Sequence, residues 1–264
     1  LERLLALGMS DATDVLLSGC SAGGLAALLA ADTIYDLLAA AGAPLRRFKL
    51  ALFSGIFQAP DDSPFARQMR TTYELANMSA PDVCTRSSAR FAAEPWRCVL
   101  GLQPLAALSA RIPVFVEQSA LDRWQTGCVL GATPSALSEV GCSAGEWEEC
   151  LQYMTPLLTS RARRQCKPSQ LLDLDQFSHS FMRVLTNHSV LHRPGSGAFL
   201  HGCHSHCPSK LGRFVVGSVS LERALLEWWR APASAPARRH RHIGCLQTWA
   251  GGTSATHEPP CRPI

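Results

Sequence analysis

The residue pattern changes abruptly, from apolar to glycine-rich, within the stretch Asp14-Val15-Leu16-Leu17-Ser18-Gly19-Cys20-Ser21-Ala22-Gly23-Gly24. Residues 14–18 form a short apolar run typical of a buried parallel strand, and a glycine-rich turn follows at once. From Leu25 to Ala41 the sequence is rich in Ala and Leu, the strongest helix formers, and Gly42 with Pro44 ends the pattern. The stretch therefore predicts a strand, a tight turn and a helix in succession.

Further apolar runs continue the same alternation along the chain. Phe48 to Phe53, Ile112 to Val116 and Ala198 to Leu200 predict three more strands, and Leu221 to Trp229 predicts a closing helix. Helical and loop segments separate these strands. The pattern favours an α/β fold with a doubly wound, mostly parallel sheet.

The glycine-rich turn contains a Gly-x-Ser-x-Gly pattern made by Gly19, Ser21 and Gly23. Between a strand and a helix, small residues on both sides of the serine allow a sharp turn that exposes its hydroxyl above the sheet. The backbone N–H of Ala22 would then be one donor of an oxyanion hole. The competing interpretation is a glycine-rich turn that only packs, but the strand-turn-helix context favours Ser21 as a nucleophile.

A nucleophilic serine needs a base and an acid that orients the base. Asp122 lies in Ser119-Ala120-Leu121-Asp122-Arg123-Trp124-Gln125, just beyond a predicted strand, where this fold places the acid. The alternative for Asp122 is a surface ion pair with Arg123.

Three histidines lie in His201-Gly202-Cys203-His204-Ser205-His206-Cys207, after the last predicted strand. Position alone does not choose the base among His201, His204 and His206. Imidazole and thiolate are also natural zinc ligands, so a zinc site is the main rival interpretation. A second matching cysteine pair is missing from the sequence, which weighs against zinc.

The chain has 264 residues, 47% hydrophobic and 17% charged, enough for one main domain with a substantial core. Residues 1–229 carry 20 charges of each sign, so the body is neutral and nucleic-acid binding is not expected.

No apolar run is long enough to predict a membrane span. After Trp229 the composition shifts to Ala, Pro, Arg and His without periodicity, which predicts a domain over 1–229 and a disordered tail over 230–264.

Eleven cysteines and the Asn-x-Ser sequons at Asn77 and Asn187 favour a secreted protein or one of the secretory pathway. Cys84 and Cys98 are a plausible disulfide pair by proximity in sequence, and a buried thiol is one interpretation of Cys20. No signal peptide is visible and the chain begins at Leu1, so we expect its natural N-terminus to be missing.

Several separate blocks resemble the pectin acetylesterase and Notum family over residues 1–229. Residues 19–24 are similar to the nucleophile block of plant pectin acetylesterases, and residues 119–125 resemble their acid block. Residues 198–207 resemble the block whose histidine lies directly before its last cysteine, and this likeness selects His206 as the base. Later landmarks of the family correspond to Trp147, Cys150, residues 166–170 and residues 177–181.

The resemblance implies an α/β-hydrolase-type serine carboxylesterase without metal or other cofactor. Its members remove O-acetyl groups from pectin, whereas Notum removes a fatty acyl group from Wnt proteins; the expected partner is therefore an acetylated polysaccharide or another acyl ester. The family also has N-terminal strands and a glycine-rich loop with further oxyanion donors, for which Ser21 comes too early. We therefore expect an incomplete chain with an open sheet edge.

Three hypotheses follow: an active polysaccharide O-acetylesterase, a catalytically inactive binding module of the same fold, and a metal-binding protein built on residues 201–207. A lipid-type deacylase is a variant of the first. Periodicity does not identify the acyl pocket. Candidates for its border are Phe53, Ile56 and Phe57, and candidates for a sugar platform or for core packing are Trp96, Trp124 and Trp147.

Overall fold

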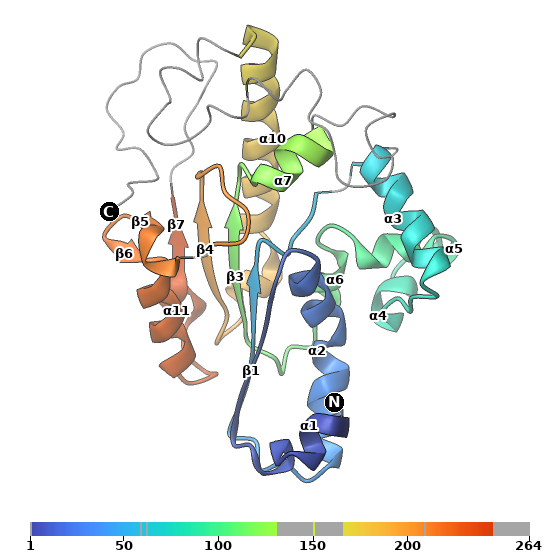
Figure 1. Ribbon diagram of the computed structural model, residues 1–264, viewed down its shortest axis with the longest axis vertical. Helices are drawn as coiled ribbons and strands as arrows, with labels where there is room; N and C mark the ends of the chain where they lie inside the picture. The colour runs from blue at the N-terminus through green and yellow to red at the C-terminus, as the bar shows by residue number, and fades with distance from the viewer. Residues whose placement is uncertain are drawn as a thin grey trace.

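The centre of the protein is a five-stranded sheet in which every neighbouring pair of strands is parallel. The computed structural model describes residues 2–58, 60–61, 63–130, 150, 166–208 and 210–244. The strands lie in the order β1-β2-β3-β4-β7 (Figure 1). Their bounds are Asp14–Cys20 for β1, Arg47–Phe53 for β2, Val114–Ser119 for β3, Gly197–His201 for β4 and Arg241–Ile243 for β7. The predicted parallel α/β sheet is confirmed.

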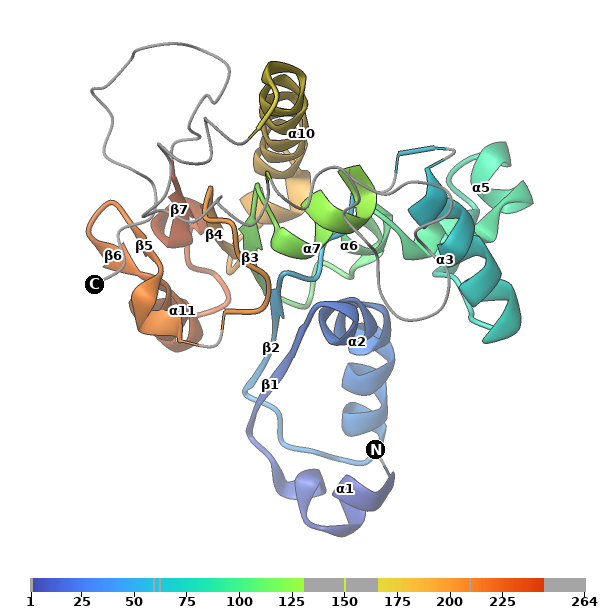
Figure 2. The same cartoon turned by 45° about the horizontal axis from the view of Figure 1, so that its top comes forward.

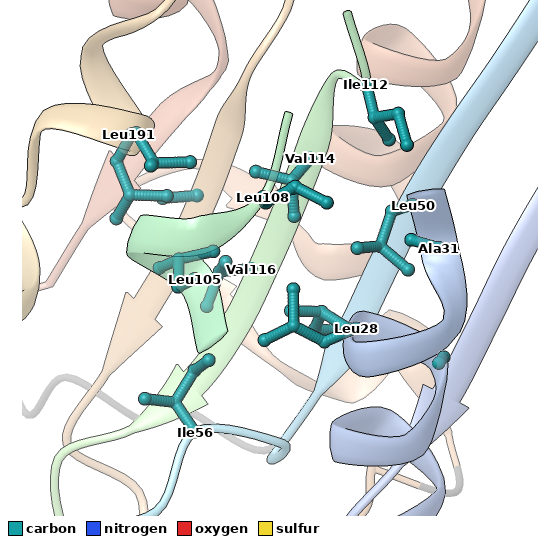
Figure 3. Packing of buried hydrophobic residues seen from close by; sticks show 14 of the residues in the cluster. Leu28, Ala31, Leu50, Ile56, Leu105, Leu108, Ile112, Val114, Val116 and Leu191 are labelled. Atoms are coloured by element: carbon teal, nitrogen blue, oxygen red, sulfur yellow. The ribbon is translucent and has the colours of Figure 1, made fainter. Parts of the chain in front are cut away.

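Helices cover both faces of the sheet because the strand residues alternate between two apolar clusters. On one face Leu50, Val114 and their neighbours pack against α2 (Ala22–Ala40) and α10 (Pro168–Thr186), as Figure 3 shows around Leu28 and Ala31 of α2. On the other face Ala51, Phe115 and Phe199 pack against α11 (Leu221–Arg230). The sheet is therefore doubly wound, and its central strand β3 is buried throughout.

The connection between β2 and β3 is built from short helices: α3 (Pro64–Leu75), α4 (Asp82–Thr85), α5 (Ala89–Ala93), η2 (Pro95–Val99) and α6 (Gln103–Ala107). The predicted disulfide between Cys84 and Cys98 is present within it. Figure 2 shows α3 and α5 at the side of the molecule away from α11. The remaining elements are α1 (Glu2–Ala6), η1 (Met9–Asp11), α7 (Arg123–Gln125), η3 (Thr126–Leu130), η5 (Ser189–His192), η6 (Leu211–Arg213), β5 (Val215–Val216), β6 (Val219–Ser220) and η7 (Ala237–His240).

The prediction that the chain is disordered from residue 230 onward is wrong for residues 231–244. The helix η7 and the strand β7 lie in this segment, and β7 joins the sheet through the parallel register of Ala198 with Arg241. A strand of three residues is too short to produce a hydrophobic period, which is why the sequence pattern concealed it. Residues 245–264 of the predicted tail lie outside the described residues.

At the opposite edge of the sheet, β1 pairs with β2, and within the described ranges it has no second neighbour. Leu16 of β1 is 41% exposed, whereas the leucines of β2 are fully buried. This is the exposed edge that the sequence led us to expect.

The helix α2 is the one helix in the described part of the chain that is long and apolar enough to cross a membrane. Its Leu28 and Leu38 are buried against the sheet, and its Asp32 and Asp36 bind Arg111. Core helices often pass the same length and composition criteria, so α2 is weak evidence of a span.

Candidate active site

The residues that follow β1, β3 and β4 meet at the carboxyl edge of the sheet. The parallel registers align Gly19 with Leu52, Phe53 with Glu117, and Ser119 with His201. The three predicted site residues come shortly after these strand ends. In doubly wound folds this edge is where ligands bind.

Ser21 occupies a strained turn between β1 and α2. Its φ of 56° and ψ of −132° lie outside the usual regions for a non-glycine residue. A side chain at position 19 would meet the carbonyl oxygen of Gly23 at 2.2 Å, so this position requires glycine. A side chain at position 24 would lie 3.0 Å from the carbonyl oxygen of Gly19 and 3.1 Å from Gly55, a tight fit that favours glycine. A side chain at Gly23 would meet nothing within 4 Å. The steric requirement of the turn thus falls on Gly19 and Gly24, the second of which the sequence pattern did not single out.

His206 joins Ser21 to Asp122. Its Nε2 lies 2.8 Å from the Ser21 Oγ, and its Nδ1 lies 2.8 Å and 3.0 Å from the two carboxylate oxygens of Asp122. Since an ionised carboxylate only accepts hydrogen bonds, Nδ1 carries the proton and Nε2 accepts from the serine hydroxyl. The structure therefore brings together the three residues that the sequence selected.

Asp122 is fully buried and has several donors besides His206. The backbone N–H groups of Trp124 and Gln125, in the short helix α7, each donate to its Oδ1 at 3.0 Å. The side-chain amide of Gln118 lies 3.4 Å from its other oxygen. These donors fix the carboxylate where the imidazole needs it, and they exclude the alternative of a surface ion pair with Arg123.

The interpretation of Cys20 as a buried thiol is wrong. Cys20 forms a disulfide with Cys207, so the residue before the candidate nucleophile is covalently joined to the residue after the candidate base. Sequence spacing does not reveal this pair because its members are 187 residues apart. Cys150 and Cys166 form a further disulfide.

The other two histidines of the segment point to different partners. The His201 Nε2 lies 2.8 Å from a carboxylate oxygen of Glu117, and the His204 Nε2 lies 3.1 Å from the hydroxyl of Thr126. Burial lowers the pKa of His204 to about 4, with a smaller contribution from the charge of Arg123. Only His206 among the three contacts Ser21.

The zinc hypothesis relies on thiolates as well as imidazoles from this segment. Cys203 and Cys207 are both disulfide-bonded, and a disulfide sulfur is not a thiolate ligand. Within the described residues, no group of three or more histidine, cysteine or acidic side chains is arranged to hold a metal ion. The segment thus offers imidazoles that are already bonded to protein groups.

Ala22 is the first residue of α2, where a backbone N–H has no acceptor within the helix. The 19-residue helix also points its positive end at Ser21. Ala22 therefore has the position expected of an oxyanion donor.

Aromatic side chains form a wall beside His206. The ring of Trp124 lies 6.4 Å from the imidazole, and Phe57 and Phe65 contact Trp124 edge to face at 5.4 Å and 5.2 Å. Trp96 is buried in the same cluster. Ile56 belongs to the main core and Phe53 packs toward α11, while Trp147 lies outside the described residues.

Comparison with known protein families gives a match over most of the chain. A family model described as Pectinacetylesterase matches residues 1–233. The chain belongs to the pectinacetylesterase family. This pectinacetylesterase family member therefore combines a parallel α/β sheet with a strained Ser21 and a disulfide next to that residue.

Two curated relatives from Arabidopsis thaliana illustrate the extent of the likeness. Pectin acetylesterase 7 is 29% identical over 213 residues, covering 78% of this chain and 47% of the relative. Pectin acetylesterase 11 is 27% identical over 243 residues, covering 87% of this chain and 55% of the relative. The chain spans about half the length of the curated family members it matches.

Among solved structures, the Wnt deacylase Notum from Drosophila has a similar fold. Two crystal forms each superpose with a TM-score of 0.65 at 20% sequence identity, and the first covers 92% of this chain and 59% of the Notum chain. At this identity the likeness concerns the fold, which agrees with the predicted α/β-hydrolase-like class.

Proposed function

We propose that this chain contains the hydrolytic centre of a serine carboxylesterase, with Ser21 as nucleophile, His206 as base and Asp122 as the group that orients the base. The observation that carries the proposal is the continuous contact from the Ser21 hydroxyl through both nitrogens of His206 to the buried carboxylate of Asp122. This geometry matches the roles of a nucleophile, a general base and an orienting acid. Membership of the pectinacetylesterase family supports an ester as the substrate.

The reaction is an acyl transfer in two stages. The Ser21 Oγ attacks the ester carbonyl carbon while its proton passes to the Nε2 of His206, and the N–H of Ala22 stabilises the oxyanion. Collapse of the tetrahedral intermediate breaks the bond to the alcohol oxygen, which receives the proton from His206. Water then attacks the acyl-enzyme by the same route, releases the carboxylic acid and restores Ser21. Asp122 remains ionised throughout.

The proposed substrate is an O-acetyl ester of pectin or a related polysaccharide. The names of the Arabidopsis relatives support this class, and the aromatic wall formed by Phe57, Phe65 and Trp124 supplies an apolar boundary beside His206. A lipid-type deacylase is the second candidate, because the Wnt deacylase Notum shares the fold.

The proposed location is outside the cell or in the secretory pathway. The disulfides favour an oxidising compartment, and both sequon residues, Asn77 and Asn187, are exposed and so accessible to glycosylation.

The test is hydrolysis of an aryl ester series from acetate to octanoate by this chain and by Ser21→Ala, with a serine-reactive phosphonate probe alongside. Labelling at Ser21 and preference for acetate, both lost in Ser21→Ala, are the expected results. Preference for octanoate would favour the lipid-type deacylase, and activity that persists in Ser21→Ala would rule out the proposed nucleophile.

Absence of both hydrolysis and labelling would favour the catalytically inactive binding module. That outcome has a physical rationale, because loss of a single oxyanion donor costs about 10²- to 10³-fold in rate. A chain with only the Ala22 donor would therefore be slow even with its three side chains in contact.

A further inference from the structure

A second carboxylate and imidazole are paired inside the sheet, behind the candidate active site. Glu117 of β3 and His201 of β4 are both fully buried, and their side chains are 2.8 Å apart. They lie on the sheet face that packs against α11, because residues two apart in a strand share a face and Phe115 and Phe199 belong to that cluster. A carboxylate at such a position is costly unless donors surround it.

Glu117 has such donors, and one of them leads back to the active site. Its second oxygen lies 3.5 Å from the Ser54 hydroxyl and accepts from the backbone N–H of Ser54 at 3.1 Å, and the same N–H also donates to the Glu117 backbone carbonyl at 3.0 Å. The same hydroxyl accepts a hydrogen bond from the backbone N–H of Cys207 at 3.1 Å. The carboxylate therefore orients Ser54, and Ser54 holds the residue that follows His206.

His201 holds the other end of the same segment. Its Nδ1 accepts from the backbone N–H of Cys203 at 3.2 Å, so its proton lies on Nε2 and is donated to Glu117. Residues 202–207, here called the histidine loop, are thus bonded to His201 near one end and, through Ser54, to Glu117 at the other end. Ser119, which accompanies Glu117 in β3, also donates from its hydroxyl to the carbonyl of Cys203.

We propose that Glu117 and His201 are positioning residues that fix the histidine loop and so hold His206 within reach of Ser21. The catalytic part of this inference rests on the proposed function. Neither side chain contacts Ser21 or Asp122 through any hydrogen bond in the described residues, so their effect passes through the loop backbone. A displacement of about 1 Å at a reacting group costs about 10²-fold in rate, so contacts that keep His206 from shifting would have a large effect on the rate.

The hydrogen-bond pattern predicts which substitutions preserve the anchor. In His201→Gln, the amide supplies one acceptor for Cys203 and one donor for Glu117, as the neutral imidazole does. In His201→Phe both bonds are lost. In Glu117→Gln, one carboxylate acceptor becomes an amide donor, so either the Nε2–H of His201 or the backbone N–H of Ser54 loses its side-chain acceptor, and the Ser54 N–H then keeps only the backbone carbonyl of residue 117.

Lys49 provides a matched control on the same face of the sheet. It is buried in β2 toward the amino end of the strands, and its ammonium group donates to the carbonyls of Trp228 and Ala231 at 2.7 Å and 2.9 Å. Lys49→Met removes buried polar bonds of similar kind but leaves the histidine loop untouched.

The experiment measures kcat and KM for aryl acetate hydrolysis together with hydrogen exchange of the histidine loop. We expect His201→Phe and Glu117→Gln to lower kcat by about 10- to 100-fold with KM within about threefold, and to speed exchange of the loop amides about tenfold. We expect His201→Gln and Lys49→Met to keep both quantities within about threefold of the wild type.

Unchanged kcat and loop exchange in folded His201→Phe and Glu117→Gln would overturn the proposal. So would a parallel loss of kcat in Lys49→Met, because that result means general destabilisation. If His201→Phe does not fold, the contrast between His201→Gln and Glu117→Gln decides. If the wild type neither hydrolyses esters nor reacts with the phosphonate probe, the proposed function fails, while loop exchange alone still decides the positioning role.

Discussion

Two carboxylate–imidazole pairs lie at the same end of the sheet and have different environments. Asp122 with His206 and Glu117 with His201 each join the region of β3 to a histidine 84 residues later, and each has a 2.8 Å contact. The side chain of His206 is 18% exposed and its second nitrogen faces Ser21. The side chain of His201 is 1% exposed, and its second nitrogen is occupied by a backbone N–H.

The comparison teaches that the partner of the second nitrogen decides what an imidazole does. A ring with one nitrogen on a carboxylate and the other on a hydroxyl can move a proton. A ring whose two nitrogens are both bonded to protein groups holds those groups at fixed positions and has no nitrogen left for a substrate or a nucleophile. Under the proposed function, the outer pair, Asp122 with His206, would transfer the proton, and the inner pair, Glu117 with His201, would hold the histidine loop in place.

The largest expected effect comes from Asp122→Asn. The asparagine oxygen stays on the backbone N–H groups of Trp124 and Gln125, so the amide NH2 faces the Nδ1 of His206. The ring proton then lies on Nε2, which can no longer accept from Ser21, and we expect kcat to fall about 10⁴-fold. Ester hydrolysis by purified protein measures the effect, and thermal unfolding shows that the variant is folded. Equal losses in Asp122→Asn and Glu117→Gln would contradict the division between an outer and an inner pair.

A second prediction concerns the disulfide that borders the outer pair. Replacement of Cys20 and Cys207 by serine removes a link between residues far apart in the chain, and we expect the free energy of unfolding to fall by about 2 to 5 kcal/mol in urea titrations. We also expect kcat to fall, because both cysteines neighbour site residues.

The matched control is replacement of Cys84 and Cys98 by serine, which opens a much shorter loop. We expect a smaller loss of stability, since the entropy of loop closure grows with loop length, and an unchanged kcat. Loss of activity only when Cys84 and Cys98 are replaced would contradict the expectation that the Cys20–Cys207 disulfide is the one that supports the site.

The third histidine of the loop gives the smallest expected effect. Burial depresses the pKa of folded His204 to about 4, whereas the unfolded group titrates near 6.5. The unfolded chain therefore binds more protons in this range, so the stability that His204 contributes is complete above pH 6.5 and is lost as the pH falls toward 4.

We expect the wild type to lose about 1 to 2 kcal/mol more than His204→Gln between pH 7 and pH 4, after allowance for partial exposure of the ring. Urea unfolding at both pH values measures the difference. Identical pH dependence in the two proteins would show that His204 is not buried in its neutral form.

Much of the fold and the site follows from local sequence. The apolar run before Ser21, the alanine-rich helix after it and the position of Asp122 beyond a strand each have a local signal, and the structure places the corresponding elements as expected. The choice of His206 among three histidines came from the resemblance to the pectin acetylesterase family.

Features that depend on distant contacts left no such signal. Glu117 directly follows an apolar run, and a charge at the end of a buried strand is the one hint that it needs a partner. Its pairing with His201 depends on strand order, and the disulfide of Cys20 depends on a contact across most of the chain. The strand β7 was missed because three residues are too few for a period to show.

The disulfide between Cys20 and Cys207 also affects how the protein responds to proteases. Any single cut of the backbone between these two cysteines leaves two fragments that remain covalently joined right beside Ser21 and His206. A nicked molecule would run as one band on a gel without reductant and as two bands with it. In a protease-rich environment, such a molecule keeps Ser21 and His206 tethered after the chain between them has been severed.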